Sequence, residues 1–236
     1  MDRRKLIWIL LFPLLAAGCL GHSGGQHATT ATTVTPTTTA TAAVKKMHLT
    51  VYAMRAGQLT AIDVQVPQTE ATAAAALHAL GIDAGVTIAG GTATVDFPDA
   101  TQQQIAEIVY TLTQFPSVQR VDIAAGKGLT RTDVDATYLP QIFVESPGMS
   151  ASVPKTFHVT GTAQVFEATF LVELRIANKV VVKQTVTASE GAPNRGTFDV
   201  TLTSPSTGPV DLVAYEPSAE NGTPLHTVHV PITVVP

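Results

Sequence analysis

The chain has 236 residues, of which 45% are hydrophobic and 14% are charged, and its formal net charge is −4 at pH 7. A chain of this length can bury a hydrophobic core without disulfide bonds, and its single cysteine leaves none to form within the chain. Nucleic-acid-binding domains carry a dense basic patch, which this composition does not supply, so we expect no nucleic-acid partner.

The first residues have the pattern of a bacterial lipoprotein leader. Basic residues at positions 3–5 precede an apolar run from Leu6 to Ala17, and the string Leu-Ala-Ala-Gly ends at Cys19. As a helix, about a dozen residues span roughly 18 Å, which is less than the hydrocarbon core of about 30 Å. We therefore expect a signal peptide over residues 1–18 that is cleaved. We also expect acyl chains such as palmitate on Cys19, holding the protein on the extracytoplasmic face of the cell membrane.

Residues 20–47 are predicted to be a disordered tether. From Ala28 to Val44 the sequence is almost entirely Thr and Ala, with Pro36 in its middle. No helical or strand period of bulky apolar residues runs through it, so the stretch has nothing to pack.

Residues 48–126 are predicted to fold as a small α+β domain, and its first part is a pair of strands and a helix. Alternating apolar residues predict strands over His48–Met54 and Ile62–Val66. An Ala-rich stretch predicts a helix over Thr69–Leu80, with Glu70 in its first turn and Gly81 just past its end.

The second part of this domain is predicted from a glycine pair and a helical period. Gly90-Gly91 between two strand-like runs indicates a hairpin. Asp99, three residues before Gln102, resembles the start of a capping box, and apolar residues follow at helical spacing as far as Phe115. With a last strand over Val118–Ile123, the domain is predicted to have two helices on one small sheet.

The rest of the chain is predicted to be a linker and an all-β domain. Residues 127–138 are mostly polar and are taken as the linker between domains. Over residues 139–236, short runs such as Phe170–Ile176, Phe198–Leu202 and Val228–Val234 alternate apolar and polar residues, with turn residues between them. This pattern is typical of an antiparallel, immunoglobulin-like β-sandwich.

Two stretches in the first half carry a resemblance to a known domain type. The run Ile108–Val121, which reads IVYTLTQFPSVQRV, resembles the most recognisable part of the GerMN domain, which is named for the sporulation and germination protein GerM. The preceding Thr94–Phe97 is similar to the strand that comes before the last helix of that domain.

The second half resembles the immunoglobulin-like domain of bacterial spore-germination proteins. Ile142–Gly148 is similar to its opening, and Val159–Ala168 is similar to its central signature. Gly196–Phe198, Tyr215–Ser218 and Asn221-Gly222 agree with its later strands. The two resemblances together imply a non-catalytic envelope module, without cofactor or metal, that self-associates or docks onto a partner.

Phe166 and Glu167 lie where the second resemblance is strongest, and two interpretations are open. In the favoured one, Phe166 packs into the core while Glu167 caps a bulge or pairs with a cation. In the other, the two residues are an interaction site for a ligand or partner.

Other motifs that suggest chemistry are weak. Ser152-Val153-Pro154-Lys155 has the spacing of a penicillin-recognising nucleophile, but that chemistry needs a helix, and Pro154 together with the surrounding strands argues for a loop leading into a strand. His226 and His229 are three apart on a predicted strand and point to opposite faces, and His158 is likewise expected to be a strand residue.

The remaining acidic residues and a sequon also have structural interpretations. Asp99 is expected to cap a helix, while Asp96 and Asp122 lie on predicted strands with no third metal ligand in view. Asn221-Gly222-Thr223 fits a glycosylation sequon, although Asn-Gly between strands is first a tight turn.

The sequence therefore favours a lipid-anchored extracytoplasmic binding or scaffold protein of the bacterial cell envelope, without catalysis. Its expected partners are the membrane through Cys19, other envelope proteins or cell-wall glycan, and a second copy of itself. The alternative is a peptidoglycan-acting envelope hydrolase or accessory factor with Glu167 or Asp122 as acid/base, which would need two carboxylates about 5–9 Å apart.

Overall fold

Two hydrophobic cores organise the part of the chain that the computed structural model describes, residues 44–124 and 126–236. One core belongs to an α+β first half and the other to an all-β second half, as the sequence predicts. The expected signal peptide, Cys19 and nearly all of the expected tether lie outside the described residues. Among the helices of the described part, none is both long enough and apolar enough to cross a membrane.

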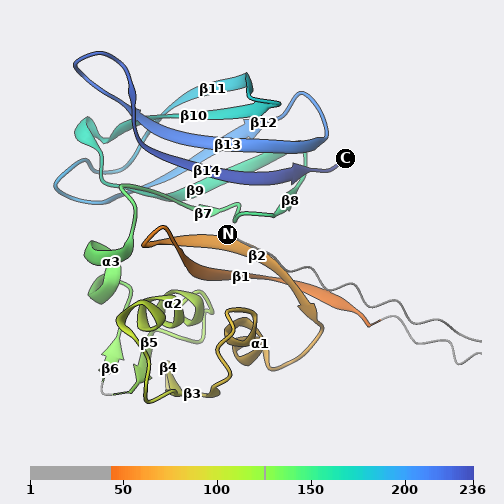
Figure 1. Cartoon of the computed structure of the whole chain (residues 1–236), viewed down its shortest axis with the longest axis vertical. Helices are drawn as coiled ribbons and strands as arrows, with labels where there is room; N and C mark the ends of the chain where they lie inside the picture. Colours follow the sequence, from red (N-terminus) through yellow and green to blue (C-terminus); the bar gives the residue numbers. More distant parts are fainter. Residues whose placement is uncertain (1–43, 125) are drawn as a thin grey trace, which may run out of the picture. The chain divides into compact units, whose positions relative to one another are not determined.

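The first half has two sheets rather than the one small sheet that was predicted. A two-stranded hairpin, β1-β2, is separate from a four-stranded sheet in the order β3-β4-β5-β6. Helices α1 and α2 lie between them and contact both (Figure 1). The elements in chain order are β1 (Lys46–Arg55), β2 (Gln58–Pro67), α1 (Thr72–Ala79), β3 (Gly85–Ala89), β4 (Thr92–Asp96), α2 (Gln102–Leu112), β5 (Arg120–Ile123), β6 (Gly126–Leu129) and α3 (Thr132–Tyr138).

The end of α1 is where the sequence places it, but its start is not. Gly81 has a φ of +77°, and its N–H donates to the carbonyl of His78 while the N–H of Ile82 donates to that of Leu77. These bonds satisfy the last carbonyls of the helix, so the predicted glycine stop is confirmed. The helix begins at Thr72, so the prediction that Glu70 lies in its first turn is wrong.

The cap of α2 lies two residues later than predicted. The Oγ1 of Thr101 accepts a hydrogen bond from the N–H of Gln104 (3.2 Å), and the N–H of Thr101 donates to the Oε1 of Gln104 (3.0 Å). This is a capping box, the reciprocal pair that a threonine and a glutamine three residues apart can form. The prediction that Asp99 caps this helix is wrong, because Thr101 and Gln104 satisfy the helix start.

The second half is a β-sandwich with sheets in the orders β11-β10-β13-β14-β8 and β12-β9-β7. Phe170 of β10 and Phe198 of β12 meet between the sheets, with ring centroids 4.9 Å apart. The elements are β7 (Ile142–Ser146), β8 (Ser152–Val153), β9 (Thr156–Ala163), the short 3-10 turn η1 (Phe166–Ala168), β10 (Thr169–Ile176), β11 (Lys179–Thr187), β12 (Gly196–Thr203), β13 (Gly208–Pro217) and β14 (Pro224–Val234).

The stretch 127–138, predicted to be a linker, is folded onto the first half. It contains most of β6, which pairs with β5, and the whole of α3. Val134 is buried in the first core, and Asp122 accepts a hydrogen bond from the N–H of Gly128 (2.7 Å). The polar composition concealed this packing, because only Val134 and Tyr138 of α3 join the core.

Candidate functional site

Strand β7 joins the two halves, because its side chains enter both cores. Ile142 and Val144 face the core of the sandwich, whereas Phe143 is 2% exposed and packs in the core of the first half. Its ring lies 6.1 Å from that of Tyr52 and 5.9 Å from that of Tyr110, centroid to centroid. A continuous apolar run of this kind marks a strand that is buried on both faces.

An arginine clamp surrounds this aromatic contact and consists of Arg131, Glu145, Tyr52 and Tyr110. The guanidinium of Arg131 lies 4.6 Å from the ring centroid of Tyr110 and 5.3 Å from that of Tyr52. It forms an ion pair with Glu145, which also accepts a hydrogen bond from the hydroxyl of Tyr52 (2.8 Å). The clamp therefore connects β1, α2 and the start of α3 to β7.

The electrostatics of the clamp fit a structural role. Burial raises the pKa of Tyr52 and of Tyr110 above the ordinary value of 10.0, and nearby carboxylates raise both further. Burial alone would lower the pKa of Arg131, but the phenols and Glu145 bring it above its ordinary value. Two neutral phenols and one charged guanidinium are thus held in place, which is not a set of groups poised to exchange protons.

A backbone contact extends the junction. The N–H of Met149 donates to the carbonyl of Ala61 (2.8 Å), and the N–H of Asp63 donates to the carbonyl of Met149 (2.8 Å). Residue 148 lies so close to β2 that a Cβ there would be 3.1 Å from the backbone nitrogen of Asp63. A side chain at position 148 would therefore be crowded against the backbone of β2, which favours glycine there.

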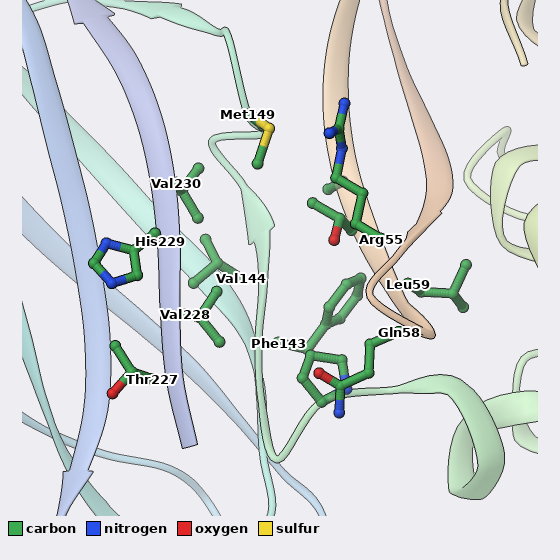
Figure 2. Close-up of a pocket in the computed structure, with 13 residues that line it drawn as sticks. Arg55, Gln58, Leu59, Phe143, Val144, Met149, Thr227, Val228, His229 and Val230 are labelled. Carbon is green, nitrogen blue, oxygen red and sulfur yellow. The ribbon is translucent and has the colours of Figure 1, made fainter. Parts of the chain in front are cut away.

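A cavity of about 190 Å³ lies at the junction, lined by residues of β2, β7 and β14 (Figure 2). The side chains of Val228 and Val230 point towards β7, whereas that of His229 points to the other side of β14, where it contacts Asp211 at 2.7 Å. The lining mixes polar and apolar side chains, and Arg55 is charged.

A second hollow, the Phe166 groove, lies on the sandwich and has a volume of about 450 Å³. The β9–β10 connection and the β13–β14 hairpin form the groove. In Figure 1 the loop of this hairpin is the dark-blue loop at the upper left. Phe166 is 65% exposed there and Leu225 is 43% exposed. Its lining residues are Phe166, Glu167, Thr169, Glu216, Pro217, Ser218, Ala219 and Leu225.

Buried neighbours and one carboxylate hold the Phe166 loop in place. Val165 and Ala168 are buried on either side of the two outward residues. The Oε1 of Glu216 accepts a hydrogen bond from the N–H of Phe166 (2.8 Å). The loop also requires Gly191, since a Cβ there would be 2.6 Å from the backbone nitrogen of Ala168.

The loop is also strained. Glu167 and Ala168 have φ values of +52° and +56°, a left-handed conformation that residues with a Cβ rarely adopt. Each such residue costs on the order of 1–3 kcal/mol, and strain of this kind is concentrated at functional sites. The turn that exposes the aromatic side chain of Phe166 therefore lowers the stability of the fold.

The groove is acidic as well as apolar. The carboxylates of Glu167 and Glu216 line it, and no lysine or arginine does. His226, which lies within β14 at the shift in its pairing with β13, has its Nε2 3.7 Å from the Oε2 of Glu216. A cationic group on a partner would therefore find two carboxylates beside the exposed apolar side chains.

The structure tests one of the two interpretations of Phe166 and Glu167, the packing of Phe166 into the core. The prediction that Phe166 packs into the core is wrong, because the strained backbone turns the ring outward. Glu167 lies in the same turn, and no hydrogen bond or ion pair involves its carboxylate among the described residues. Sequence reasoning missed the role of Glu216, which was quoted only within the string Tyr215–Ser218.

The other motifs take structural positions. Ser152 and Val153 form β8, and β9 begins at Thr156, so the predicted absence of a helix at this Ser-x-x-Lys string is confirmed. His158 contacts Asp199 across the strands at 2.8 Å. Within residues 44–124 and 126–236, no three or more His, Cys, Asp or Glu side chains gather in a way that could hold a metal ion.

Comparison with known proteins assigns both halves. A family model described as "Sporulation and spore germination" matches residues 24–127. A second, described as "Immunoglobulin-like domain of bacterial spore germination", matches residues 141–223. No curated protein matches the chain.

Among solved structures, the chain is similar to the tandem GerMN domains of the sporulation protein GerM from Bacillus subtilis. The two share 14% sequence identity and a TM-score of 0.35, and the match covers 80% of this chain and 61% of that one. The assignment of each half therefore rests on the family models, and the α+β and all-β folds agree with them. The chain consists of a GerMN-type domain followed by the immunoglobulin-like domain of bacterial spore germination, two kinds of domain associated with sporulation and germination.

Proposed function

We propose that the protein is a non-catalytic binding or scaffold protein of the bacterial cell envelope that acts in sporulation or spore germination. It is anchored by lipid on Cys19 at the extracytoplasmic face of the membrane and makes contacts with other envelope proteins or cell-wall glycan. The observation that carries the binding role is the exposed Phe166 on a braced and strained loop.

The energetics of this loop support binding. Burying a phenylalanine side chain is worth about 1.5–3 kcal/mol, and much of this is forgone at 65% exposure. The positive φ values of the two following residues add a further cost. Covering the ring with a partner would recover the burial term, which is how aromatic anchors work in interfaces.

The junction supports a scaffold role. The clamp, the aromatic contact of Phe143 and the backbone bonds to Met149 tie the two domains together along β7 and β2. A scaffold must hold its binding surfaces in fixed relation, and a packed contact between domains favours this.

The anchor and the binding role are tested together in membranes of the producing organism. Cells that express wild type or Cys19→Ala are labelled with palmitate, treated with a membrane-permeant crosslinker and fractionated. We expect label, membrane association and crosslinked envelope partners for the wild type, with label and membrane association lost in Cys19→Ala. Equal labelling of both proteins would overturn the anchor, and wild type recovered only as an uncrosslinked monomer would overturn the binding role.

The hydrolase remains as a second candidate because Glu167 and Glu216 line one groove. Against it, Glu216 already accepts the Phe166 N–H and lies beside His226, so its carboxylate has a structural task. Asp122 lies in the other domain, where it binds the Gly128 N–H. A zymogram on peptidoglycan decides: clearing by wild type that disappears in Glu167→Gln would favour the enzyme, and no clearing is expected.

A further inference from the structure

We propose that the Phe166 groove binds a protein segment in which an apolar side chain is flanked by lysine or arginine. This inference rests on the proposed binding function and names the chemistry of its partner. It goes further by committing the groove to a protein rather than to a wall polymer.

The apolar part of the inference comes from two exposed side chains that face one hollow. Among the described residues, six large hydrophobic side chains are exposed, and Phe166 and Leu225 both line this groove. Pro217 and Ala219 add further apolar side chains to the lining. The volume of about 450 Å³ lies within the range of about 300–1,000 Å³ that is usual for ligand pockets. An apolar anchor side chain can therefore be buried here.

The basic part of the inference comes from charge complementarity. Glu167 and Glu216 line the groove, and Glu220 is exposed on the hairpin loop that forms one wall. His226 contacts one of these carboxylates, which leaves Glu167 free of any ion pair among the described residues. Lysine or arginine beside the anchor would meet these carboxylates at the rim, where such pairs set specificity and association rate.

The same charges disfavour a wall polymer. Wall polymers that carry mainly carboxylate or phosphate groups would place these groups against the glutamates of the groove. Like charges across an interface act against a partner, because they are left unpaired when water is removed. The groove thus selects between the two kinds of envelope partner that the proposed function allows.

The backbone of the loop prepares the groove for binding. The Glu216 carboxylate and the close approach of Gly191 fix residues 165–168 before any partner arrives. A preformed loop loses little conformational entropy on binding, so more of the contact energy appears as affinity.

The test is a selection from a random-peptide display library on the full-length protein, followed by titration of the selected peptides. We expect enriched peptides to carry an apolar residue flanked by lysine or arginine. Their affinity should fall about tenfold or more in Phe166→Ala and about threefold in Glu167→Gln. It should also weaken as salt increases, because the rim charges are screened. Val180→Ala is the matched control, since Val180 is 42% exposed on β11 outside the groove, and we expect it to bind as wild type does.

Several outcomes would overturn the inference. One is the selection of acidic or uncharged peptides, and another is binding that is unchanged in Phe166→Ala. A third is no enriched peptide at all while soluble peptidoglycan fragments bind. Thermal unfolding of each variant shows that lost binding is not lost folding. In each of these cases the membrane crosslinking experiment still tests the binding role separately, because it reports partners whichever surface they use.

Discussion

Two phenylalanines of the immunoglobulin-like domain have opposite fates. Phe143 on β7 is 2% exposed and packs against two tyrosines of the other domain, whereas Phe166 is 65% exposed beside a strained turn. Both residues occur in strings that resemble the same domain type. The difference shows that a phenylalanine in a recognised motif does not have to serve the core. At the junction, Phe143 stabilises the packing of the two domains. At the groove, a strained turn holds Phe166 exposed to solvent.

The largest expected effect comes from removing the junction ring. Phe143→Ala is expected to lower the free energy of unfolding by about 3–5 kcal/mol, because it removes a buried ring and leaves a cavity between the domains. Urea denaturation followed by circular dichroism measures this. A loss below about 1 kcal/mol would mean that the domains do not depend on this contact.

The second effect is alkaline destabilisation through the clamp tyrosines. Burial raises the pKa of Tyr52 and Tyr110 above 10.0, so the unfolded state loses these protons first as the pH rises. Their stabilising contribution is complete below pH 10 and falls by up to about 1.4 kcal/mol per tyrosine for each pH unit above it.

Unfolding free energies measured from neutral to alkaline pH test this prediction. Phenolate absorbance in the same samples should appear for these two tyrosines only as the chain unfolds. The double variant Tyr52→Phe/Tyr110→Phe should have a shallower dependence on pH. A slope identical to that of wild type would contradict the buried, protonated state.

A smaller effect is expected from opening the clamp. Arg131→Met keeps an unbranched but shorter side chain and leaves Glu145 with only the hydroxyl of Tyr52. Since the two side chains are 29% and 31% exposed, we expect a loss of about 1–2 kcal/mol rather than the larger cost of a fully buried pair. Thermal unfolding measures the change, and Lys179→Met on the exposed end of β11 is the control. Equal melting temperatures of the two variants would show that the clamp adds nothing.

The smallest effect on stability is expected at the groove itself. Phe166→Ala should change the free energy of unfolding by less than about 0.5 kcal/mol, because the ring is mostly in water. The same denaturation experiment that measures Phe143→Ala measures it. A loss as large as that of Phe143→Ala would remove the contrast between the two regions.

Much of the fold is predictable because its patterns are local. The glycine stop at Gly81, the hairpin at Gly90-Gly91 and the alternation of β10, β12 and β14 all follow from backbone freedom and period. The start of α2 was misplaced because Asp99 and Thr101 are both good caps, and only the reciprocal bond to Gln104 selects between them. The split of the first half into two sheets depends on long-range packing that no local period reports.

The candidate site was predictable only in part. The resemblance drew attention to Phe166 and Glu167, but the left-handed turn at Glu167 has no glycine to announce it, so the exposure of Phe166 could not be foreseen. The second wall of the groove lies about 50 residues later in the chain, and the bond from Phe166 to Glu216 appears only in three dimensions. The folding of residues 127–138 could not be predicted for a similar reason. Val134 packs in the core of the first half, and Asp135 accepts a hydrogen bond from the hydroxyl of Tyr110, which is distant in sequence.

The most direct measurement is photo-crosslinking from position 166 in the membrane of the producing organism. A photoreactive phenylalanine analogue replaces Phe166 in one strain and Val180, an exposed residue outside the groove, in another. A covalent adduct with another protein is expected from position 166, absent from position 180 and suppressed by an excess of a selected basic peptide. Adducts that are equal at both positions, or no protein adduct at position 166, would contradict the assignment of the Phe166 groove as the binding site.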